Sequence, residues 1–551
     1  MQGYSETVAV EVRVFQKSGG TLTFGVSQGG GGWHRMQGLT APTLSVAVSR
    51  QIGRGGNGVF VLPGLSETQT GSHWVDLISL GDWVQIDATV QRAPGRQRDE
   101  DGLSHSWRTL FFGRVLEVEE SEQPDGDGFA FVTTVTADDF LGGLEQPHFS
   151  YWRKLGATFG SNGDLREKLN RLDRFDLGEE NVTAPTIAVG ASIVLEAFIE
   201  GRIDIRRKLG KKDVDLKDTY GFRFESDGFQ TGAMDLNSLA PEAQSWKGAL
   251  EEIVDGPVFY EMFQDSLKVS DADTRAPDSD EVGGSSRGQA RSRRAKYKGR
   301  GDYAELLVIR PAPFPTYRDE IDGSGNPTGK SVYSDAAWNA LPLIECAPFA
   351  HGNLKVKKSR THLKTVFSVN IQILGTNGAG VTTEADSNAQ IVADMEKLLV
   401  DVGYDPLDIA TKRLPASKDG QSLSNPQLSR ALGWQLFSFN HLNDLYLDGS
   451  SSIPVDLRVQ LGARWREADY LFYTEGYVHT FTPEAATTSL TLSRGLMVEA
   501  YGLKPTGRKT VEGTMNYVRK YLGRKRPGET LTPQAAQGIM NELNIEAGAA
   551  P

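Results

Sequence analysis

The sequence predicts a mainly β fold with α+β parts: two β-barrel domains with flanking helices, a middle α+β region and a C-terminal helical arm. Three observations predict it. Residues 470–494 form two strand-like runs around a short break, and three short motifs of this late region have counterparts early in the chain. An apolar content of 38% with 61 glycines in 551 residues is typical of a β-rich protein with many loops.

The hairpin predicted at residues 470–494 has one arm with a clear alternation of side chains. Its runs are rich in aromatic and β-branched residues, and Pro483 lies in the break between them. In the second arm, one face carries two leucines and one threonine, and the other face carries only serine and threonine side chains. The two faces are therefore unlike. We expect one face in the core and the other at a contact surface; the residues are Thr488, Leu490 and Leu492 against Ser489, Thr491 and Ser493.

The repeated motifs predict two copies of one barrel unit. The early copy reads L-G-D-W-V at 80–84, F-F-G-R-V at 111–115 and V-T-T-V-T at 132–136. The late copy reads L-G-A-R-W at 461–465, E-G-Y-V at 475–478 and T-T-S-L-T at 487–491. On this basis the predicted domains are a first barrel at 1–149, the middle region at 150–360, a second barrel at 361–500 and the arm at 501–551.

Within the first barrel, strands are expected at 8–16 with a partner at 21–26, at 44–48 and 58–62, and near Trp83, Phe112 and Val132, ending near Leu144. Two other segments read as loops. The four glycines at 29–32 are not followed by Lys-Ser/Thr, so a flexible loop is favoured over a phosphate-binding loop. The charged insertion between Val90 and Trp107 reads as a solvated loop.

The middle region carries two helical patterns and one mobile loop. Helices are expected at 164–172 and around Ala243, Trp246, Leu250 and Val254, the second one followed by a strand at 258–263. Residues 277–300 hold almost nothing apolar, so we expect a mobile loop. Its seven basic residues at 287–300 leave a nucleic-acid or lipid contact open as the alternative.

The second barrel is expected to open with a strand at 365–371 and to be completed by a strand at 454–461. Helices at 386–402 and from 425 towards 436 would flank it. Two further helices are expected after residue 501, one with Met515, Val518, Tyr521 and Leu522 on one face. Because they follow the last barrel strand, we favour a docking arm for a neighbouring subunit over a free tail.

Three segments resemble a known family. The G-Y-V strand at 476–478 followed by T-T-S-L-T-L-S-R-G at 487–495 is similar to the late barrel of phage tail baseplate hub proteins, the late-control-protein-D group. Residues 358–369 resemble the entry to that barrel, and residues 249–261 the middle helix and its following strand. The resemblance extends from about residue 40 to about residue 500, and none of its motifs is catalytic.

The resemblance implies two tail-tube-like barrels and a structural role. Three copies of a chain with two like barrels would present six quasi-equivalent units to a six-fold tail tube and a three-fold face to a spike. The implied partners are two further copies in a homotrimer, a tail tube or distal tail protein, and a spike or tip protein; a tape-measure protein is a further candidate. The implied location is the virion tail baseplate after synthesis in the host cytoplasm, and the hub of a phage-related contractile injection system stays open.

Charge and residue types exclude several other functions. The net charge of −12 disfavours a protein that grips DNA, so DNA is expected only as passing cargo through a conduit whose acidic wall would repel it. The single cysteine, Cys346, excludes an intrachain disulfide and a thiolate metal cluster. The sequence contains no run of about 18 apolar residues, so we expect no stable insertion into a membrane. The first residues lack a basic and an apolar segment, so we expect no secretory signal.

No catalytic, cofactor-binding or metal-binding residue is assigned, and we expect no enzyme. The eight histidines lack metal-ligand spacing, and no Gly-x-Ser-x-Gly or Walker motif occurs. His479, in a Y-V-H-T-F strand, is expected in the barrel wall or at an interface. Two alternatives stay open: a peptidoglycan hydrolase with its carboxylates in 150–240, and a carbohydrate-binding protein whose aromatic platforms would be Trp33, Trp74, Trp83 or Trp107.

Overall fold

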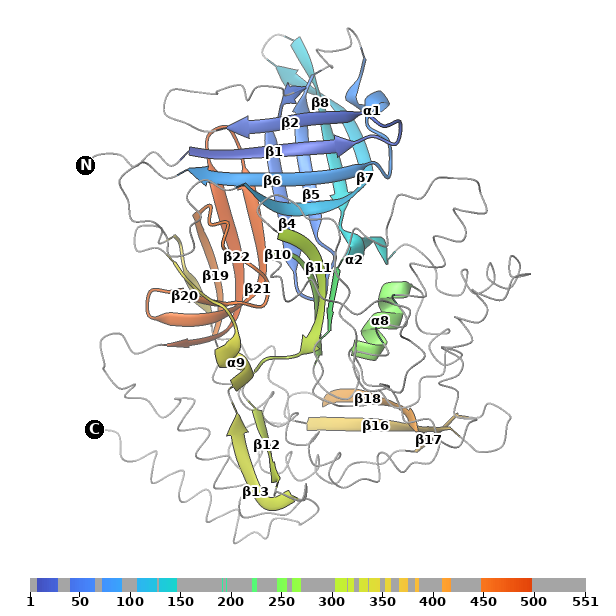
Figure 1. Ribbon diagram of the computed structural model, residues 1–551, viewed down its shortest axis with the longest axis vertical. Helices are drawn as coiled ribbons and strands as arrows, with labels where there is room; N and C mark the ends of the chain where they lie inside the picture. The colour runs from blue at the N-terminus through green and yellow to red at the C-terminus, as the bar shows by residue number, and fades with distance from the viewer. Residues whose placement is uncertain are drawn as a thin grey trace.

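The computed structural model shows a mainly β protein, and one large sheet contains most of its strands (Figure 1). The structure describes two single residues, 191 and 195, and the following ranges: 7–27, 40–64, 72–91, 107–125, 128–145, 221–224, 245–254, 260–268, 303–314, 316–321, 327–334, 336–346, 352–357, 366–374, 382–385, 409–417 and 447–497.

The early half of the chain contributes eight strands and two short helices to the large sheet and its margin. They confirm the strands predicted at 8–16, 21–26, 44–48 and 58–62 and near Trp83, Phe112 and Val132. The strands are β1 (Thr7–Phe15), β2 (Thr21–Ser27), β3 (Ala41–Pro42), β4 (Ser45–Gln51), β5 (Asn57–Pro63), β6 (Trp83–Gln91), β7 (Arg108–Asp125) and β8 (Gly128–Asp138), and the helices are α1 (Trp74–Leu77) and α2 (Phe140–Gly143).

The late half contributes six strands to the same sheet. The hairpin predicted at residues 470–494 is confirmed, and its arms are β21 and β22. In the turn between them, the backbone N–H of Thr482 donates a hydrogen bond to the carbonyl of Ala485 at 2.8 Å. The strands are β14 (Leu343–Glu345), β15 (Lys355–Lys357), β19 (Leu447–Pro454), β20 (Arg464–Glu467), β21 (Tyr470–Phe481) and β22 (Ala486–Met497); the short helix α9 (Ala336–Ala340) precedes β14.

The two halves contain the same five-stranded arrangement. In the first, the spatial order is β4-β5-β8-β7-β6; in the second it is β15-β19-β22-β21-β20. All the neighbours are antiparallel in both, and the chain visits the five positions in the same sequence. We call these units the first and the second repeat. The repeated topology agrees with an internal duplication, while closure of each unit into a barrel and the predicted domain boundaries stay predictions.

The hydrogen-bond register makes the repeats equivalent residue by residue. Pro63 and Pro454 end β5 and β19 at matching places, opposite Val132 and Thr487. Gly58 and Gly449 lie five residues before these prolines, and a Cβ on either would come within 2.8 Å of a phenylalanine ring carbon of the same repeat. Each glycine therefore makes room for an aromatic side chain of its own core.

Two of the three predicted motif matches keep this register. Residues 80–84 lead into β6 as 461–465 lead into β20, and Val132 is equivalent to Thr487. The middle match is displaced by four residues. Both long strands bulge at the same place, since the register shifts between Val115 and Glu117 in β7 and between Thr474 and Gly476 in β21. Gly476 is thus equivalent to Glu117, and pairing it with Gly113 was wrong because the bulge, rather than a shared glycine, marks this position.

The alternation in β22 produces the two faces predicted for it. Thr488, Leu490 and Leu492 are buried, while Ser489 and Thr491 are exposed. Apolar side chains of the inner face join two clusters. One cluster fills the first repeat together with β1, β2 and Phe481; the other fills the second repeat and includes Trp465 and Phe472.

Two predictions about the second barrel are wrong. The strand at 365–371 exists as β16 (Val366–Leu374), but it pairs with β17 (Thr382–Ala385) and β18 (Ile409–Ser417) in a separate sheet, so the second repeat begins at β15 instead. The strand expected at 454–461 lies earlier, because β19 ends at Pro454 and the following residues turn towards β20. Strand propensity located both segments approximately but could not specify their partners.

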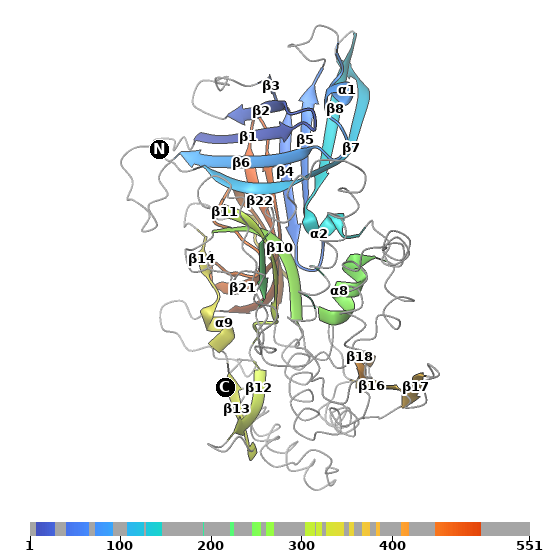
Figure 2. The ribbon, with the colours of Figure 1, turned by 45° about the vertical axis from the view of Figure 1, so that its right-hand side comes forward.

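A three-stranded sheet of the middle region packs against both repeats (Figure 2). It consists of β9 (Gly221–Phe224), β10 (Tyr260–Lys268) and β11 (Tyr303–Pro311), in the order β10-β11-β9. The predicted helix around residue 250 is α8 (Trp246–Val254), with Trp246, Leu250 and Val254 buried. The strand expected at 258–263 corresponds to β10.

A two-stranded hairpin, β12 (Thr316–Ile321) and β13 (Pro327–Ser334), lies away from the large sheet (Figure 1). None of the helices among the described residues is long and apolar enough to cross a membrane. The predictions for residues 29–32, 92–106, 164–172, 277–300, 386–402, 425–436 and 501–551 fall on segments outside the described residues.

Candidate functional site at the junction of the two repeats

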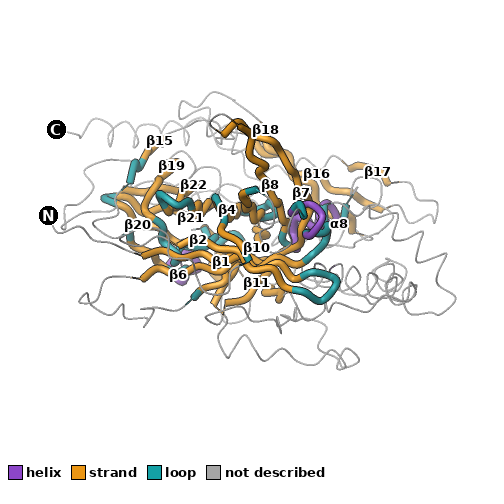
Figure 3. Tube along the Cα trace, turned by 90° about the horizontal axis from the view of Figure 1, so that it is seen from above, coloured by secondary structure: helices purple, strands orange, loops and turns teal. Residues whose placement is uncertain are grey.

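The two repeats are joined edge to edge by β4 and β21. Six residue pairs, from Val46 with Phe481 to Gln51 with Gly476, form an antiparallel ladder between segments more than 400 positions apart in the sequence. We call these paired residues, 46–51 and 476–481, the junction. Seen from above, β19, β22, β21 and β4 follow one another as a single sheet (Figure 3).

The junction has one buried and one uncharged open face. Strand alternation places apolar and aromatic side chains inward, together with an arginine and a histidine. Val46, Val48 and Arg50 lie opposite Phe481, His479 and Tyr477. The other face carries small and hydroxyl-bearing side chains, namely Ala47, Ser49, Val478 and Thr480. Val478 is 37% exposed, so this face is open to solvent in the single chain.

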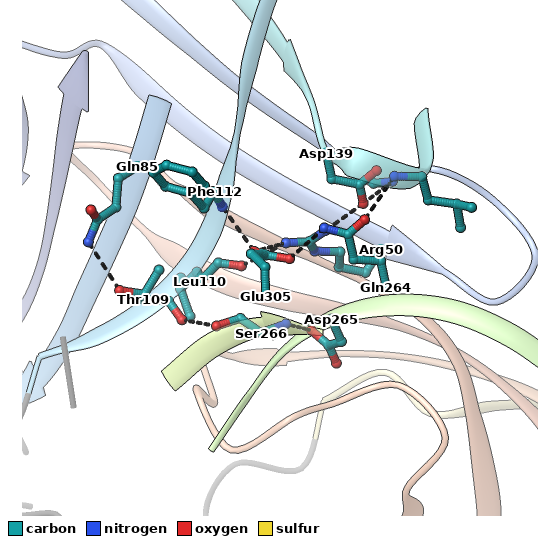
Figure 4. Close-up of polar contacts among 12 residues, drawn as sticks. Arg50, Gln85, Thr109, Leu110, Phe112, Asp139, Gln264, Asp265, Ser266 and Glu305 are labelled. Carbon is teal, nitrogen blue, oxygen red and sulfur yellow. Dashed lines mark hydrogen bonds and ion pairs between the residues drawn. The ribbon is translucent and has the colours of Figure 1, made fainter. Parts of the chain in front are cut away.

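Arg50 is the centre of a buried ionic cluster beneath the junction (Figure 4). Its Nη1 donates to Asp139 Oδ2 at 2.6 Å and its Nη2 to Glu305 Oε1 at 2.5 Å. The guanidinium also lies over the ring of Phe111, 5.0 Å from its centroid. These contacts join three parts of the chain, because Arg50 is on β4, Asp139 precedes α2 and Glu305 is on β11.

Burial decides the protonation equilibria of the cluster. Desolvation opposes the charge of Arg50, but Glu305 and Asp139 outweigh it and raise the pKa of the guanidinium above its ordinary value. Desolvation raises the pKa of Glu305 to about 7, although Arg50 opposes the shift. Desolvation likewise raises the pKa of Asp139, again against Arg50. The cluster therefore depends on every member keeping its partner.

Asp139 also fixes the backbone around it. Its carboxylate accepts hydrogen bonds from the N–H groups of Gly56, at 2.7 Å, and Gly142, at 2.8 Å. The second contact caps the N-terminus of α2. Asp139 thus contacts the turn between β4 and β5, the helix α2 and the guanidinium of Arg50 at the same time.

The middle sheet is held to the first repeat by buried polar contacts. Glu305 accepts a hydrogen bond from the backbone N–H of Phe112 at 2.9 Å, and Gln264 donates to Glu305 Oε2 at 3.0 Å. Gln264 also accepts from the N–H of Leu141 at 2.8 Å. Ser266 donates its hydroxyl proton to the carbonyl of Thr109 at 2.5 Å.

A second set of contacts holds the same sheet to the second repeat. Asp265 accepts from the hydroxyl of Tyr477 at 2.6 Å and from the N–H of Leu461 at 2.7 Å. Glu261 accepts from the hydroxyl of Tyr473 at 2.5 Å and pairs with Arg310 at 2.5 Å. Strand β10 therefore connects both repeats on the buried side of the junction.

His479 lies inside the junction, in agreement with its predicted place in a wall or interface. It is fully buried opposite Val48, and its Nδ1 lies 2.9 Å from Thr488 Oγ1. Desolvation and the nearby Arg108 lower the pKa of the imidazole to about 3, although Asp456 opposes the shift. The ring is neutral at physiological pH.

The contacts of this site join the first repeat, the second repeat and the middle sheet. Each buried carboxylate of the cluster is engaged by donors of the protein, and the described residues contain no group of three or more His, Cys, Asp or Glu that could hold a metal ion. Burial, with Glu467 and Asp456, raises the pKa of the Cys346 thiol to about 12. The thiol is accordingly a poor nucleophile at neutral pH.

Two of the proposed carbohydrate platforms are core residues. Trp74 is fully buried, with its ring edge against Phe24, and Trp83 is 8% exposed and stacks on Phe112. Trp33 and almost all of the region 150–240 that was considered for a hydrolase lie outside the described residues.

The residues of the ionic cluster were missed from the sequence, although a signal exists. Alternation in S-V-A-V-S-R-Q puts Arg50 on the same face as Val46 and Val48, which indicates a buried cation. Glu305 lies similarly within the apolar run A-E-L-L-V-I. A charged side chain at a core position predicts a buried partner, though not its identity.

Comparison with known proteins finds similarity in structure only. No family model matches the sequence, and no curated protein does. The 43 kDa tail protein of prophage MuSo2 from Shewanella oneidensis is 8% identical, with a TM-score of 0.38, over 89% of this chain and 98% of that one. A tail protein of Neisseria meningitidis MC58 is 9% identical, with a TM-score of 0.36, over 88% and 96%.

The c3393 protein of E. coli, a component of the type VI secretion system, is 8% identical, with a TM-score of 0.33, over 86% of this chain and 78% of that one. The first two structures are described as tail proteins, one of them from a prophage, and the third as a component of a secretion system. At such TM-scores and identities the likeness alone assigns neither a family nor a function.

Proposed function

We propose that this chain is the baseplate hub of a phage tail, in which three copies form a ring of six like units between a six-fold tube and a three-fold spike or tip. The observation that carries the proposal is the junction. Two units of equal topology lie side by side in one chain and share a sheet, so the chain already contains one lateral contact of such a ring. Repetition of that contact between chains would complete the ring.

The open face of the junction suits the wall of a conduit. Its small, hydroxyl-bearing side chains offer DNA no cations, and the chain as a whole is acidic. Binding to phosphates requires clustered positive charge, so a wall of this kind would let DNA pass without retaining it. In this proposal the uncharged surface of the junction and the exposed acidic side chains further along the sheet, Glu117 and Glu119 on β7, belong to the same wall.

In this proposal the partners are those of a connector. The ring would contact a tail tube or distal tail protein on one side and a spike or tip protein on the other, with the arm at 501–551 as a docking segment and a tape-measure protein as a further neighbour. The middle region, 150–360, would set the width of the lumen. No residue performs covalent chemistry; the buried contacts of β10 and β11 keep the two repeats in one fixed orientation.

The location of the chain in particles tests the function. Antibodies against it should label the distal end of the tail in purified virions or injection particles, and particles produced without the chain should lack complete tails. Complete, infectious tails formed without the chain would overturn the proposal. Digestion of peptidoglycan by the purified chain in a zymogram, lost on substitution of a carboxylate in 150–240, would instead identify a hydrolase.

A further inference from the structure

We infer that the edge of β15 in one copy pairs with the edge of β7 in a second copy, in the register of the internal junction. This inference rests on the proposed ring, and it specifies which surfaces close that ring. It commits to a second copy of this chain as the occupant of both edges, in a head-to-tail arrangement.

The repeat equivalence identifies the two edges. Within the chain, β4 of the first repeat pairs with β21 of the second. The strand equivalent to β4 is β15, and the strand equivalent to β21 is β7, because each has the same place in its five-stranded order. A contact of the second repeat of one copy with the first repeat of the next would therefore join β15 to β7.

Both edges are free of strand partners among the described residues. β15 pairs with β19 alone. On β7, pairing with β6 ends at Arg114, and from Glu117 to Glu122 the strand pairs only with β8. The same part of β21 carries β4 on this side, so β7 lacks the neighbour that its equivalent has. Viewed from above, β15 and β7 lie on opposite sides of β4, as a head-to-tail contact requires (Figure 3).

The internal junction also predicts the register. Val48 lies opposite His479, and these residues are equivalent to Val356 and Glu120. Transfer of the ladder therefore places Lys357 opposite Glu119 and Lys355 opposite Ser121. One face of the new contact would hold Glu117 and Glu119 beside Lys355 and Lys357, as directly opposite or diagonal neighbours.

Charge complementarity supports this pairing. Lys355 and Lys357 are exposed on β15, and Glu117 and Glu119 are exposed on β7; none of the four is in an ion pair among the described residues. Two basic edges or two acidic edges would repel each other, whereas a basic edge and an acidic edge attract. The charges thus favour a head-to-tail contact over a two-fold dimer through either edge.

Two exposed apolar side chains lie at the same edges. Leu116 is 40% exposed beside the acidic segment, and Val356 is 37% exposed between the two lysines. Pairing would place Val356 against the inner face of β7, opposite Glu120, and would cover part of the Val356 side chain. Backbone pairing and apolar burial would supply affinity, and the charges would supply orientation.

Charge reversal tests the inference. E117K with E119K puts lysines on both edges, and K355E with K357E puts carboxylates on both. Each double variant is expected to raise the dissociation constant of the assembled ring about tenfold or more at low salt. The quadruple variant E117K/E119K/K355E/K357E restores opposite charges and should assemble like the wild type. Equal melting temperatures of all the chains at a concentration where they are monomeric control for folding.

Mixing the two double variants gives a sharper result. A β15–β7 contact between two chains of unlike variants joins opposite charges. A ring of three must contain two neighbours of the same variant, and the contact between those two joins like charges. The mixture should therefore gain pairs of chains without recovering the three-membered ring. Full recovery of the ring on mixing would contradict the predicted head-to-tail contact.

Cysteine crosslinking tests the register. E119C with K357C should form a disulfide between chains on mild oxidation, because directly opposite Cβ atoms in a ladder lie close enough. E119C with K355C, a diagonal pair, should crosslink far less. The native Cys346 should not interfere, since it is buried and its thiol has a raised pKa.

The outcomes separate the inference from the proposed function. A ring that forms in every variant, with no crosslink at Glu119 and Lys357, overturns the β15–β7 contact and leaves the hub intact. A wild-type chain that forms no ring even with its tail partners overturns the proposed function itself. Weakening in both double variants, recovery in the quadruple variant and the specific crosslink together support the inference.

Discussion

Gly81 and Gly462 have the same left-handed backbone conformation, with φ of +78° and +69°, two residues before equivalent strands. Each donates its N–H to the residue at the bulge of the neighbouring long strand: Gly81 to the carbonyl of Val115 at 2.7 Å, and Gly462 to that of Thr474 at 3.0 Å. The two repeats therefore share a turn as well as a strand order. A detail of this kind agrees with descent from one duplicated unit.

Replacing either glycine with alanine should destabilise the fold. A side chain in the left-handed region costs about 1–2 kcal/mol. We expect Gly462→Ala to cost more than Gly81→Ala, because its Cβ would meet the guanidinium of Arg310, which has to move. Urea denaturation measures both. Gly143→Ala is the control, since its Cβ would meet no heavy atom within 4 Å and it should stay within about 0.5 kcal/mol; equal effects at all three positions would contradict the account.

Arg50→Met should be among the most destabilising single substitutions in the described part of the chain. It leaves Asp139 and Glu305 buried without their cation, and loss of one partner of a buried ion pair costs about 3–5 kcal/mol. The urea midpoint of the variant should be lower than that of the wild type, and proteolysis between the middle sheet and the repeats should be faster.

The matched control for this substitution is Arg466→Met. Arg466 pairs with Glu345 at 3.1 Å, but both side chains are largely exposed, so the expected loss is at most about 1 kcal/mol. Similar losses for Arg50 and Arg466 would show that the buried cluster does not hold the junction.

His479 should make stability fall in mild acid. Its folded-state pKa, about 3, lies below the ordinary value of 6.5, so below pH 6.5 the unfolded chain binds a proton that the folded chain does not. The effect of His479 on stability is absent above pH 6.5 and grows as the pH falls from there towards 3, reaching a loss of about 2 kcal/mol at pH 5. The measurement is the urea midpoint of the wild type and of His479→Gln between pH 7.5 and pH 5.

The variant removes this proton uptake and leaves every other titrating group in place. Its stability should therefore depend less steeply on pH than that of the wild type, even if it is lower at pH 7.5. Parallel pH profiles of the two proteins would contradict a buried neutral imidazole at the junction.

Tyr473→Phe should loosen the middle sheet from the second repeat. The lost hydroxyl donates to Glu261, a buried carboxylate whose remaining partner among the described residues is Arg310, so a cost of about 1–3 kcal/mol is expected. A double-mutant cycle with Glu261→Gln isolates the contact. Strict additivity of the two substitutions would show that the hydroxyl and the carboxylate are not coupled in solution.

Local patterns predicted the strands well and their partners poorly. The hairpin formed by β21 and β22 was foreseeable because its arms are adjacent and alternate clearly, and the matches at residues 80–84 and 132–136 showed the duplication. Pairing of β4 with β21 was not foreseeable, because nothing local relates residues so far apart in the sequence. For the same reason the strand at 366–374 was assigned to the wrong sheet.

The buried polar network was harder to predict than the core. Apolar alternation locates core faces, but the contacts of Arg50 depend on Asp139 and Glu305, which lie on other elements. The equivalence of β15 with β4 became visible only in the register, since K-V-K is too short and too polar to read as a strand. Pair-specific contacts of this kind require the three-dimensional arrangement.

The mass of the purified assembly, combined with a low-resolution map of its symmetry, tests the central claim most directly. Three copies of a 60.2 kDa chain, about 181 kDa, with six lobes of like shape around a three-fold axis are the predicted result. A chain that stays monodisperse and monomeric at micromolar concentration, alone and with its tail partners, or a ring with a number of copies other than three, would contradict it.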